Sequence, residues 1–152
     1  MLTLKLQETM SGWIELNSDR KQEALAFSID VIFAHRLQPL RPQPFTGVVR
    51  LADRHYETPT QGFLTLKVSG PRYELEFEHP ELGLVELAGE KQYDLTNLKE
   101  SLTVCPLTVY QDRKAIGYAE VAYRDSILAF PLRSLRLVRD DAELGYQQES
   151  LP

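Results

Sequence analysis

Three side chains that commonly ligate metals alternate in the segment Asp53-x-His55-x-Glu57. Alternate residues of an extended chain point to the same side, so two carboxyl groups and an imidazole would share one face. Such donors bind zinc or iron. The sequence offers no second cluster with suitable spacing to complete the shell, and a charged strand end running into Thr58-Pro59 accounts for the same residues. We therefore keep Asp53, His55 and Glu57 as metal candidates only, and we expect neither a bound metal nor a cofactor.

The single cysteine, Cys105, is the other residue to be weighed for chemistry. A nucleophilic cysteine needs a neighbouring base and an accessible, polarised position, and its sequence neighbours supply neither. No nucleophile-elbow, phosphate-loop or dinucleotide motif is present. We expect Cys105 to be a small buried residue and the protein not to be an enzyme. One cysteine also allows no intrachain disulfide, which is typical of a reducing compartment.

The length and the net charge of the chain restrict the classes of protein to which it can belong. A chain of 152 residues is long enough for one domain with a substantial core. We predict a single domain over residues 1–139 and a flexible acidic tail over residues 140–152. The net charge of −5 without a basic block argues against a nucleic-acid partner. The N-terminus lacks the pattern of a signal peptide and no apolar run is long enough for a membrane span, so we expect a cytoplasmic protein.

The chain also repeats one pattern, in which a glycine is followed by an aromatic residue and, further on, by a short apolar return segment. Its copies are Gly12-Trp13-x-x-Leu16 with Leu25-x-Phe27, Gly62-Phe63-x-x-Leu66 with Leu75-x-Phe77, and Gly117-Tyr118-x-x-Val121 with Leu128-x-Phe130. Repeats are assigned first because they set the architecture. Each copy predicts one β-hairpin.

Period-two alternation supports this reading over most of the sequence. It is clearest in Leu25–Phe33 and in Tyr73–Phe77, where apolar and polar residues take turns. A further similarity between Gly47–Asp53 and Gly83–Gly89 suggests two related halves. We predict an all-β fold, either an antiparallel sandwich or a flattened barrel of about nine to ten strands with pseudo-repeated halves. One short helix is predicted over Asp94–Ser101.

Five aromatic residues of these hairpins are candidate ligand contacts: Trp13, Phe27, Phe63, Phe77 and Tyr118. Rings at equivalent places could line one apolar cavity, as in barrels that hold a small ligand. They could equally fill core corners or cover the neighbouring glycines. The sequence does not choose between these two roles.

In its order of motifs, the chain resembles the all-β repeat region appended to some bacterial glucose–methanol–choline oxidoreductases of the cholesterol-oxidase-like group. The matching motifs are Glu8-Thr9-Met10-Ser11-Gly12, Gly62-Phe63-Leu64-Thr65-Leu66, Tyr73-Glu74-Leu75-Glu76-Phe77, Leu87-Ala88-Gly89-Glu90-Lys91, Leu102-Thr103, Leu107-Thr108-Val109-Tyr110 and Gly117. In that family the flavin domain and its catalytic residues lie outside this region, so no catalytic residue is carried over. The stretch 100–106 departs from the family pattern.

The resemblance implies an accessory domain, here without the flavin domain, that handles apolar substrates. Our first hypothesis is a non-catalytic accessory or binding domain that holds a small apolar molecule or lipid. The alternative is a protein-interaction module that docks by its sheet edges onto an enzyme, such as an oxidoreductase partner, or onto itself through self-association.

Overall fold

The computed structural model describes residues 2–33, 41–91, 104–123 and 135–139, and these form nine strands and one 3-10 turn. The strands are β1 (Leu2–Leu16), β2 (Gln22–Phe33), β3 (Gln43–Leu51), β4 (Tyr56–Lys67), β5 (Gly70–His79), β6 (Gly83–Glu90), β7 (Val104–Gln111), β8 (Lys114–Tyr123) and β9 (Leu135–Arg139), and the turn is η1 (Ala52–Arg54). The predicted all-β class is confirmed, and η1 is the only helical element within these ranges.

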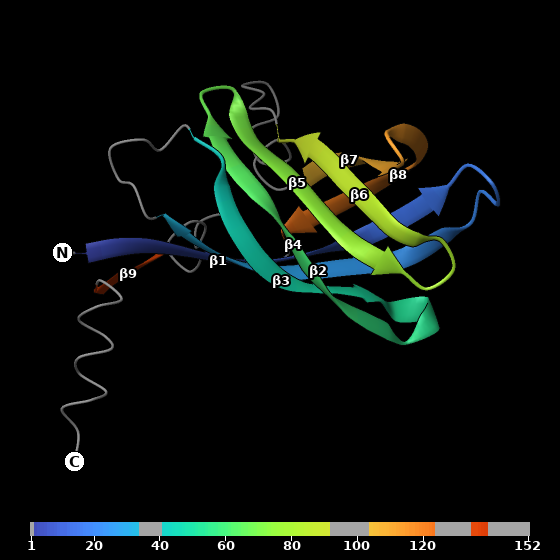
Figure 1. Cartoon of the computed structure of the whole chain (residues 1–152), viewed down its shortest axis with the longest axis horizontal. Helices are drawn as coiled ribbons and strands as arrows, with labels where there is room; N and C mark the ends of the chain where they lie inside the picture. The colour runs from blue at the N-terminus through green and yellow to red at the C-terminus, as the bar shows by residue number, and fades with distance from the viewer. Residues whose placement is uncertain (1, 34–40, 92–103, 124–134, 140–152) are drawn as a thin grey trace, which may run out of the picture.

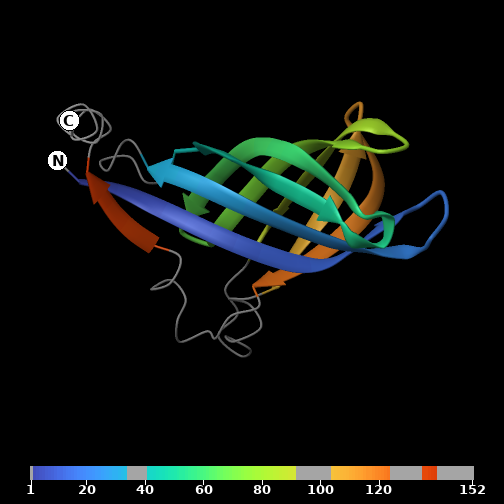
Figure 2. The same ribbon diagram turned by 90° about the horizontal axis from the view of Figure 1, so that it is seen from below.

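Eight of the strands follow one another around a closed antiparallel barrel (Figures 1 and 2). Each strand pairs with the next, and β1 closes the ring by pairing with both β2 and β8. The long β1 also pairs with β9 through Leu2–Leu6, beyond the part that contacts β8. Of the two predicted architectures the structure is therefore the barrel and not the sandwich. The predicted helix at Asp94–Ser101 and the tail at 140–152 lie outside the described residues.

Alternation of side chains divides each strand between an inner and an outer face. In β5, Tyr73, Leu75 and Phe77 are buried while Glu74 and Glu78 are exposed. The same period of two follows from the pleat of a strand with one face in the core. The inner faces together form one hydrophobic cluster that draws residues from all of the strands β1 to β8.

Inward-facing glycines occur where neighbouring strands approach closely. A Cβ atom added to Gly62 would lie 1.9 Å from the Glu74 carbonyl oxygen, and one added to Gly12 would lie 1.8 Å from that of Glu120. Gly117, which begins the third sequence copy, would meet the Glu15 carbonyl at 2.3 Å. Only a residue without a side chain allows such an approach, and glycines at these places let strands bend into a small barrel.

Two short hairpins have turns that contain residues with positive φ angles. Residues Asp112 and Arg113 join β7 to β8 with φ angles of 50° and 67°. Two left-handed residues in a two-residue loop make a turn whose twist suits the flanking strands. Gly70, with φ 141°, begins β5 directly after the turn that follows β4. The hairpins predicted from the first two sequence copies are β1–β2 and β4–β5, and the return half of the third copy lies outside the described residues.

Candidate functional site

The structure separates the five aromatic candidates into two groups. Phe27 and Phe77 face the interior and are almost fully buried. Trp13, Phe63 and Tyr118 follow inward-facing glycines, so the pleat turns their rings to the outer face. Phe63 is 48% exposed and Tyr118 57%. The five rings therefore do not line one shared cavity, and the core-filling role fits only the first two.

The described interior is filled by side chains. Its hydrophobic residues, from Met10 on β1 to Tyr123 on β8, are between 0% and 7% exposed. A void wide enough for water would raise these values for the residues around it. An eight-stranded barrel is just wide enough for its inward side chains to fill. The described part of the barrel therefore offers no space for a ligand among these core side chains.

A network of ionisable side chains crosses this interior. The Tyr73 hydroxyl on β5 donates a hydrogen bond of 2.6 Å to the Glu8 carboxyl group on β1, and both residues are buried. The Lys91 ammonium group, also buried, lies 5.4 Å from the centre of the Tyr73 ring, within the range of a cation–π contact. Around the barrel, β5 is four strands away from β1 in both directions. The network therefore connects opposite walls of the barrel.

Cys105 belongs to the same region and is buried. Its thiol is fully buried, and burial raises the pKa of Cys105 to about 12, with the nearby Lys91 and Glu8 exerting opposing smaller effects. A thiol that stays protonated at neutral pH does not attack substrates. The predicted role as a small buried residue agrees with this placement, although the ionisable neighbours were not predicted.

The metal candidates do not form a binding site. Asp53 lies in η1, where its carboxylate accepts a hydrogen bond of 3.3 Å from the Ala24 amide. His55 ends that turn in the left-handed conformation with φ 50°, and Glu57 lies on β4. Within the described residues no group of three or more histidine, cysteine or acidic side chains is arranged to hold a metal ion.

One buried histidine has a defined structural role. Both the Glu81 and the Leu82 amides donate to Nδ1 of His79, at 3.1 and 3.3 Å, so the ring fixes the turn between β5 and β6. Nδ1 can accept only in the neutral ring. Burial, followed by the nearby positive charge of Arg54, lowers the pKa of His79. The ring therefore favours the neutral form that the turn requires.

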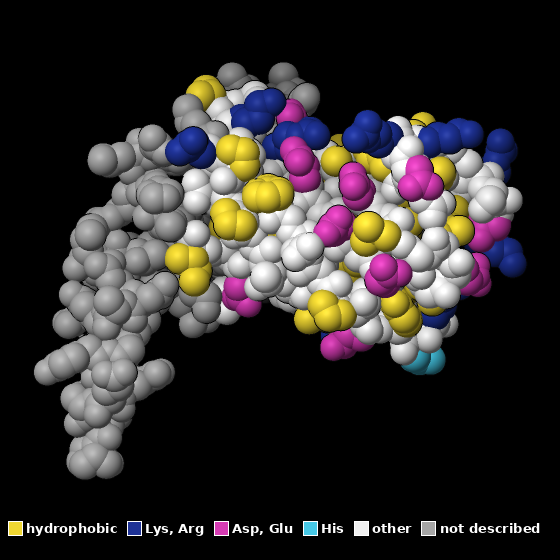
Figure 3. All heavy atoms as spheres, in the orientation of Figure 1, with side chains coloured by type: hydrophobic (Ala, Val, Ile, Leu, Met, Phe, Trp, Pro, Cys, Tyr) yellow, Lys and Arg dark blue, Asp and Glu magenta, His cyan; other side chains and the backbone are white. Residues whose placement is uncertain are grey.

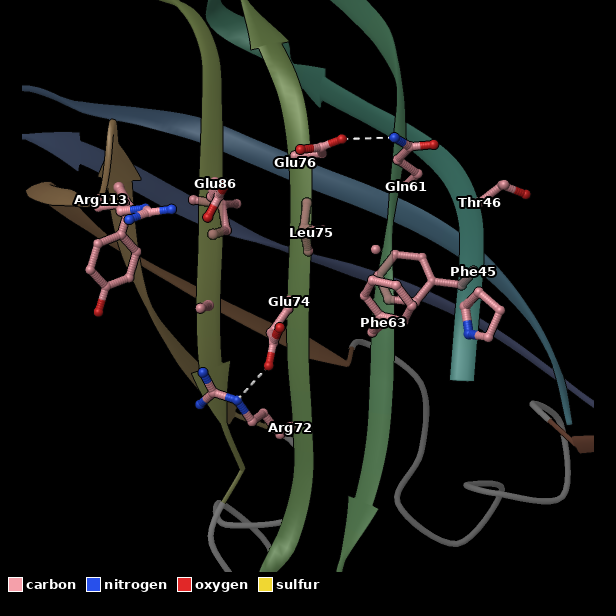
Figure 4. A pocket seen from close by; sticks show the side chains of 15 residues that line it. Phe45, Thr46, Gln61, Phe63, Arg72, Glu74, Leu75, Glu76, Glu86 and Arg113 are labelled. Carbon is pink, nitrogen blue, oxygen red and sulfur yellow. Dashed lines mark hydrogen bonds and ion pairs between the residues drawn. The ribbon is translucent and has the colours of Figure 1, made fainter. Parts of the chain in front are cut away.

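A recess with a volume of about 680 Å³ lies on the outer face of the barrel, across strands β3 to β7 (Figure 4). This is the usual size for a ligand site. Its lining residues are Pro44, Phe45, Thr46, Gln61, Gly62, Phe63, Arg72, Glu74, Leu75, Glu76, Glu86, Leu87, Ala88, Tyr110 and Arg113. We call this recess the outer groove.

Strand register arranges the polar residues of the outer groove in a line. Thr46 pairs with Gln61, Gln61 with Glu76, Glu76 with Glu86, and Glu86 with Tyr110. Figure 4 shows Thr46, Gln61, Glu76 and Glu86 following one another across the strands. The Gln61 amide donates to Glu76 at 2.7 Å. These five residues, here called the polar row, cross the sheet at right angles to the strands.

A second line, two residues along each strand, is more apolar. Pro44 pairs with Phe63, Phe63 with Glu74, and Glu74 with Ala88. The half-exposed ring of Phe63 is the largest apolar surface in this line, here called the apolar row. At the other end of the row, Ala88 contributes only a methyl group. The outer groove thus has one polar side and one side on which the apolar residues Pro44, Phe63 and Ala88 flank the carboxylate of Glu74.

An ion pair with Arg72 compensates the negative charge of Glu74 in the apolar row. Arg72 contacts Glu74 at 2.8 Å and Glu90 at 3.5 Å, and Glu90 also accepts from Lys67 at 2.8 Å. The hydrogen bond from Lys67 is the main reason that the pKa of Glu90 is lowered. On the face shown in Figure 3, acidic and hydrophobic side chains are intermingled, while basic side chains gather along the upper margin. Of the cations in the outer groove, Arg113 is the one drawn next to a carboxylate of the polar row, that of Glu86 (Figure 4).

Sequence reasoning found only part of the outer groove. It named Phe63, and it noted the acidic alternation that includes Glu76, but it could not bring Glu86 or Tyr110 beside them. The missing information was the register of β5, β6 and β7, which aligns residues from separate hairpins. The glycine before Phe63 was the available signal, because it marks an inward position and so sends the next side chain outward.

Comparisons with protein-family models, with curated proteins and with solved structures returned no match to this chain. In the part of the chain that the structure describes, no helix has both the length and the apolar character needed to cross a bilayer.

Proposed function

We propose that the protein is a non-catalytic binding module and that its ligand site is the outer groove. The observation that carries this proposal is the half-exposed Phe63 ring in a recess of about 680 Å³. Exposed apolar surface costs free energy in water, and in monomeric proteins it commonly marks a binding site when it lies in a recess. A small apolar or amphipathic molecule suits the apolar row, as the resemblance to an accessory domain also suggests.

The filled interior supports an external site over an internal one. Core residues such as Leu64 and Leu87 have no exposed surface, so a ligand between them would have to expand the barrel. An apolar guest could also not hydrogen-bond to the polar groups of Glu8, Tyr73 and Lys91, which lie in this interior. Binding at the outer groove requires neither change.

Docking by sheet edges, the alternative function, is restricted by closure of the barrel. Strands β1 to β8 each have neighbours on both sides, and among the described strands only β9 is paired on one side alone. A closed barrel has no edge to extend. An edge-based partner would therefore have to add to β9, and we rank this function second.

The test uses a neutral apolar fluorophore, N-phenyl-1-naphthylamine, whose emission rises when it leaves water. We expect it to bind the native protein and to lose most of its binding in Phe63→Ser. The matched control is Leu84→Ser, because Leu84 is 51% exposed on the outer face of β6 but does not line the outer groove. Equal binding by wild type and Phe63→Ser, or equal losses in both variants, would contradict the proposal.

A further inference from the structure

We propose that the natural occupant of the outer groove is an extended polypeptide segment in which basic and apolar residues alternate. This inference rests on the proposed function and adds the chemical class of the ligand. It follows from two features of the outer groove, namely a pair of facing carboxylates and the spacing of its two rows.

The facing carboxylates are Glu76 on β5 and Glu86 on β6, which stand directly opposite each other in the register. Their Cβ atoms are expected to lie about 5 Å apart, a distance at which like charges destabilise a sheet. Gln61 donates to Glu76. Arg113 also lines the outer groove beside Glu86 (Figure 4), but among the described residues it forms no ion pair with that carboxylate. A cation placed between the two carboxylates would remove the repulsion, so this position favours a basic group.

Protection of a sheet edge does not explain this pair. Rows of charge commonly prevent exposed strands from aggregating. However, β5 lies between β4 and β6, and β6 lies between β5 and β7, so neither strand is an edge. The carboxylates therefore face a recess in the middle of a continuous sheet, next to the aromatic rings of Phe63 and Tyr110.

The dimensions suit an extended chain lying across the strands. The polar row runs over five neighbouring strands, from β3 to β7, which corresponds to about 19 Å at the usual strand spacing. An extended segment of roughly six residues covers this length. The polar and apolar rows are two residues apart along each strand, which is roughly 7 Å.

Alternation follows from these two rows. Successive side chains of an extended segment point to opposite sides. A segment running along the outer groove would therefore direct every second side chain toward Glu76 and Glu86. The others would point toward Phe63 and Ala88 and toward the Glu74–Arg72 ion pair that lies between them. Basic residues suit the first direction and apolar residues the second, so the sequence pattern of the ligand should have a period of two.

The experiment uses three fluorescein-labelled hexapeptides and reads binding by fluorescence anisotropy. The first alternates arginine and leucine, the second has the same composition in two blocks, and the third alternates glutamine and leucine. We expect the first to bind about three- to tenfold more tightly than each of the others. High salt should reduce its advantage over the glutamine peptide, since Glu86 is exposed to solvent and Glu76 is half-buried.

Charge variants assign the preference to the outer groove. The double variant Glu76→Gln/Glu86→Gln should bind the arginine and glutamine peptides about equally. Its control, Glu57→Gln/Glu120→Gln, changes the net charge by the same amount on outer faces away from the outer groove and should keep the preference. Equal effects of the two double variants would show general charge attraction and overturn the inference.

The two proposals fail in different ways. If all three peptides bind alike while the fluorophore still depends on Phe63, the outer groove is a binding site and the polypeptide inference is wrong. If the fluorophore does not depend on Phe63, the proposed function fails as well. Tighter binding of the blocked peptide than of the alternating one would also refute the inference, because it would remove the role of the two rows.

Discussion

Removal of one hydroxyl group from the barrel interior should destabilise the protein measurably. The substitution Tyr73→Phe deletes the donor of the 2.6 Å hydrogen bond to Glu8 and leaves the ring in place. Because Glu8 is only 4% exposed, water cannot replace the lost donor without entering the core. The change therefore removes the hydroxyl group that links β5 to the Glu8 carboxyl group on the opposite wall of the barrel.

The size of the effect follows from the kind of bond. A hydrogen bond to a charged group contributes about 1.5–3 kcal/mol, and loss of one partner in a buried pair costs a similar amount in uncompensated desolvation. We expect the free energy of unfolding to fall by about 2 kcal/mol. For a chain of this length that corresponds to a decrease of about 4–8 °C in melting temperature.

A double-mutant cycle provides the assay, with urea unfolding followed by circular dichroism. We expect Tyr73→Phe and Glu8→Gln to be strongly coupled, so that the double variant is destabilised by clearly less than the sum of the single variants. The control is Tyr118→Phe, because Tyr118 is 57% exposed and should change stability by less than about 0.5 kcal/mol. If the effects of Tyr73→Phe and Glu8→Gln on stability are additive, the two side chains are not coupled and the prediction is wrong.

Three further predictions concern residues away from the outer groove. Cys105, with its buried thiol and pKa of about 12, should resist iodoacetamide in the native protein and react on unfolding; rapid native labelling would contradict its placement. Since the pKa of His79 is lowered below 6.5, the unfolded state binds the proton more tightly, and stability should fall as pH drops from about 6.5, by at most about 1.4 kcal/mol per pH unit. In pH-dependent unfolding, His79→Asn should weaken this dependence, and an unchanged profile would refute it. Gly62→Ala, which would put a Cβ 1.9 Å from the Glu74 carbonyl, should lower stability in thermal unfolding, and a gain would show that the strands separate easily.

The sequence could predict most of the strands because their alternation is a local property. Residues Leu25–Phe33 and Tyr73–Phe77 were assigned correctly, and both lie within observed strands. The first repeat copy begins at Gly12, whereas β1 runs without interruption from Leu2 to Leu16. An inward-facing glycine marks a close approach of strands there and not the start of a new strand.

Closure of the barrel could not be predicted, because it depends on pairing between distant strands. Barrel and sandwich share the same alternation, and what distinguishes them here is the pairing of β1 with both β2 and β8. The buried contact between Glu8 and Tyr73 has the same origin, with 65 residues between the partners. Neither residue carries a local signal that its polar group lies inside the barrel.

The alternation that builds the barrel also separates stability from binding. In β4, Leu64 points into the core and its neighbour Phe63 points into the outer groove, so adjacent residues serve different purposes. Substitution of Leu64 should cost several kcal/mol of stability, as is usual for a buried leucine, whereas Phe63→Ser should cost little. A binding site inside the barrel would not allow this separation, because the same side chains would then form the core and contact the ligand. Independent changes in binding and stability for these two neighbours would therefore locate the site on the outer face.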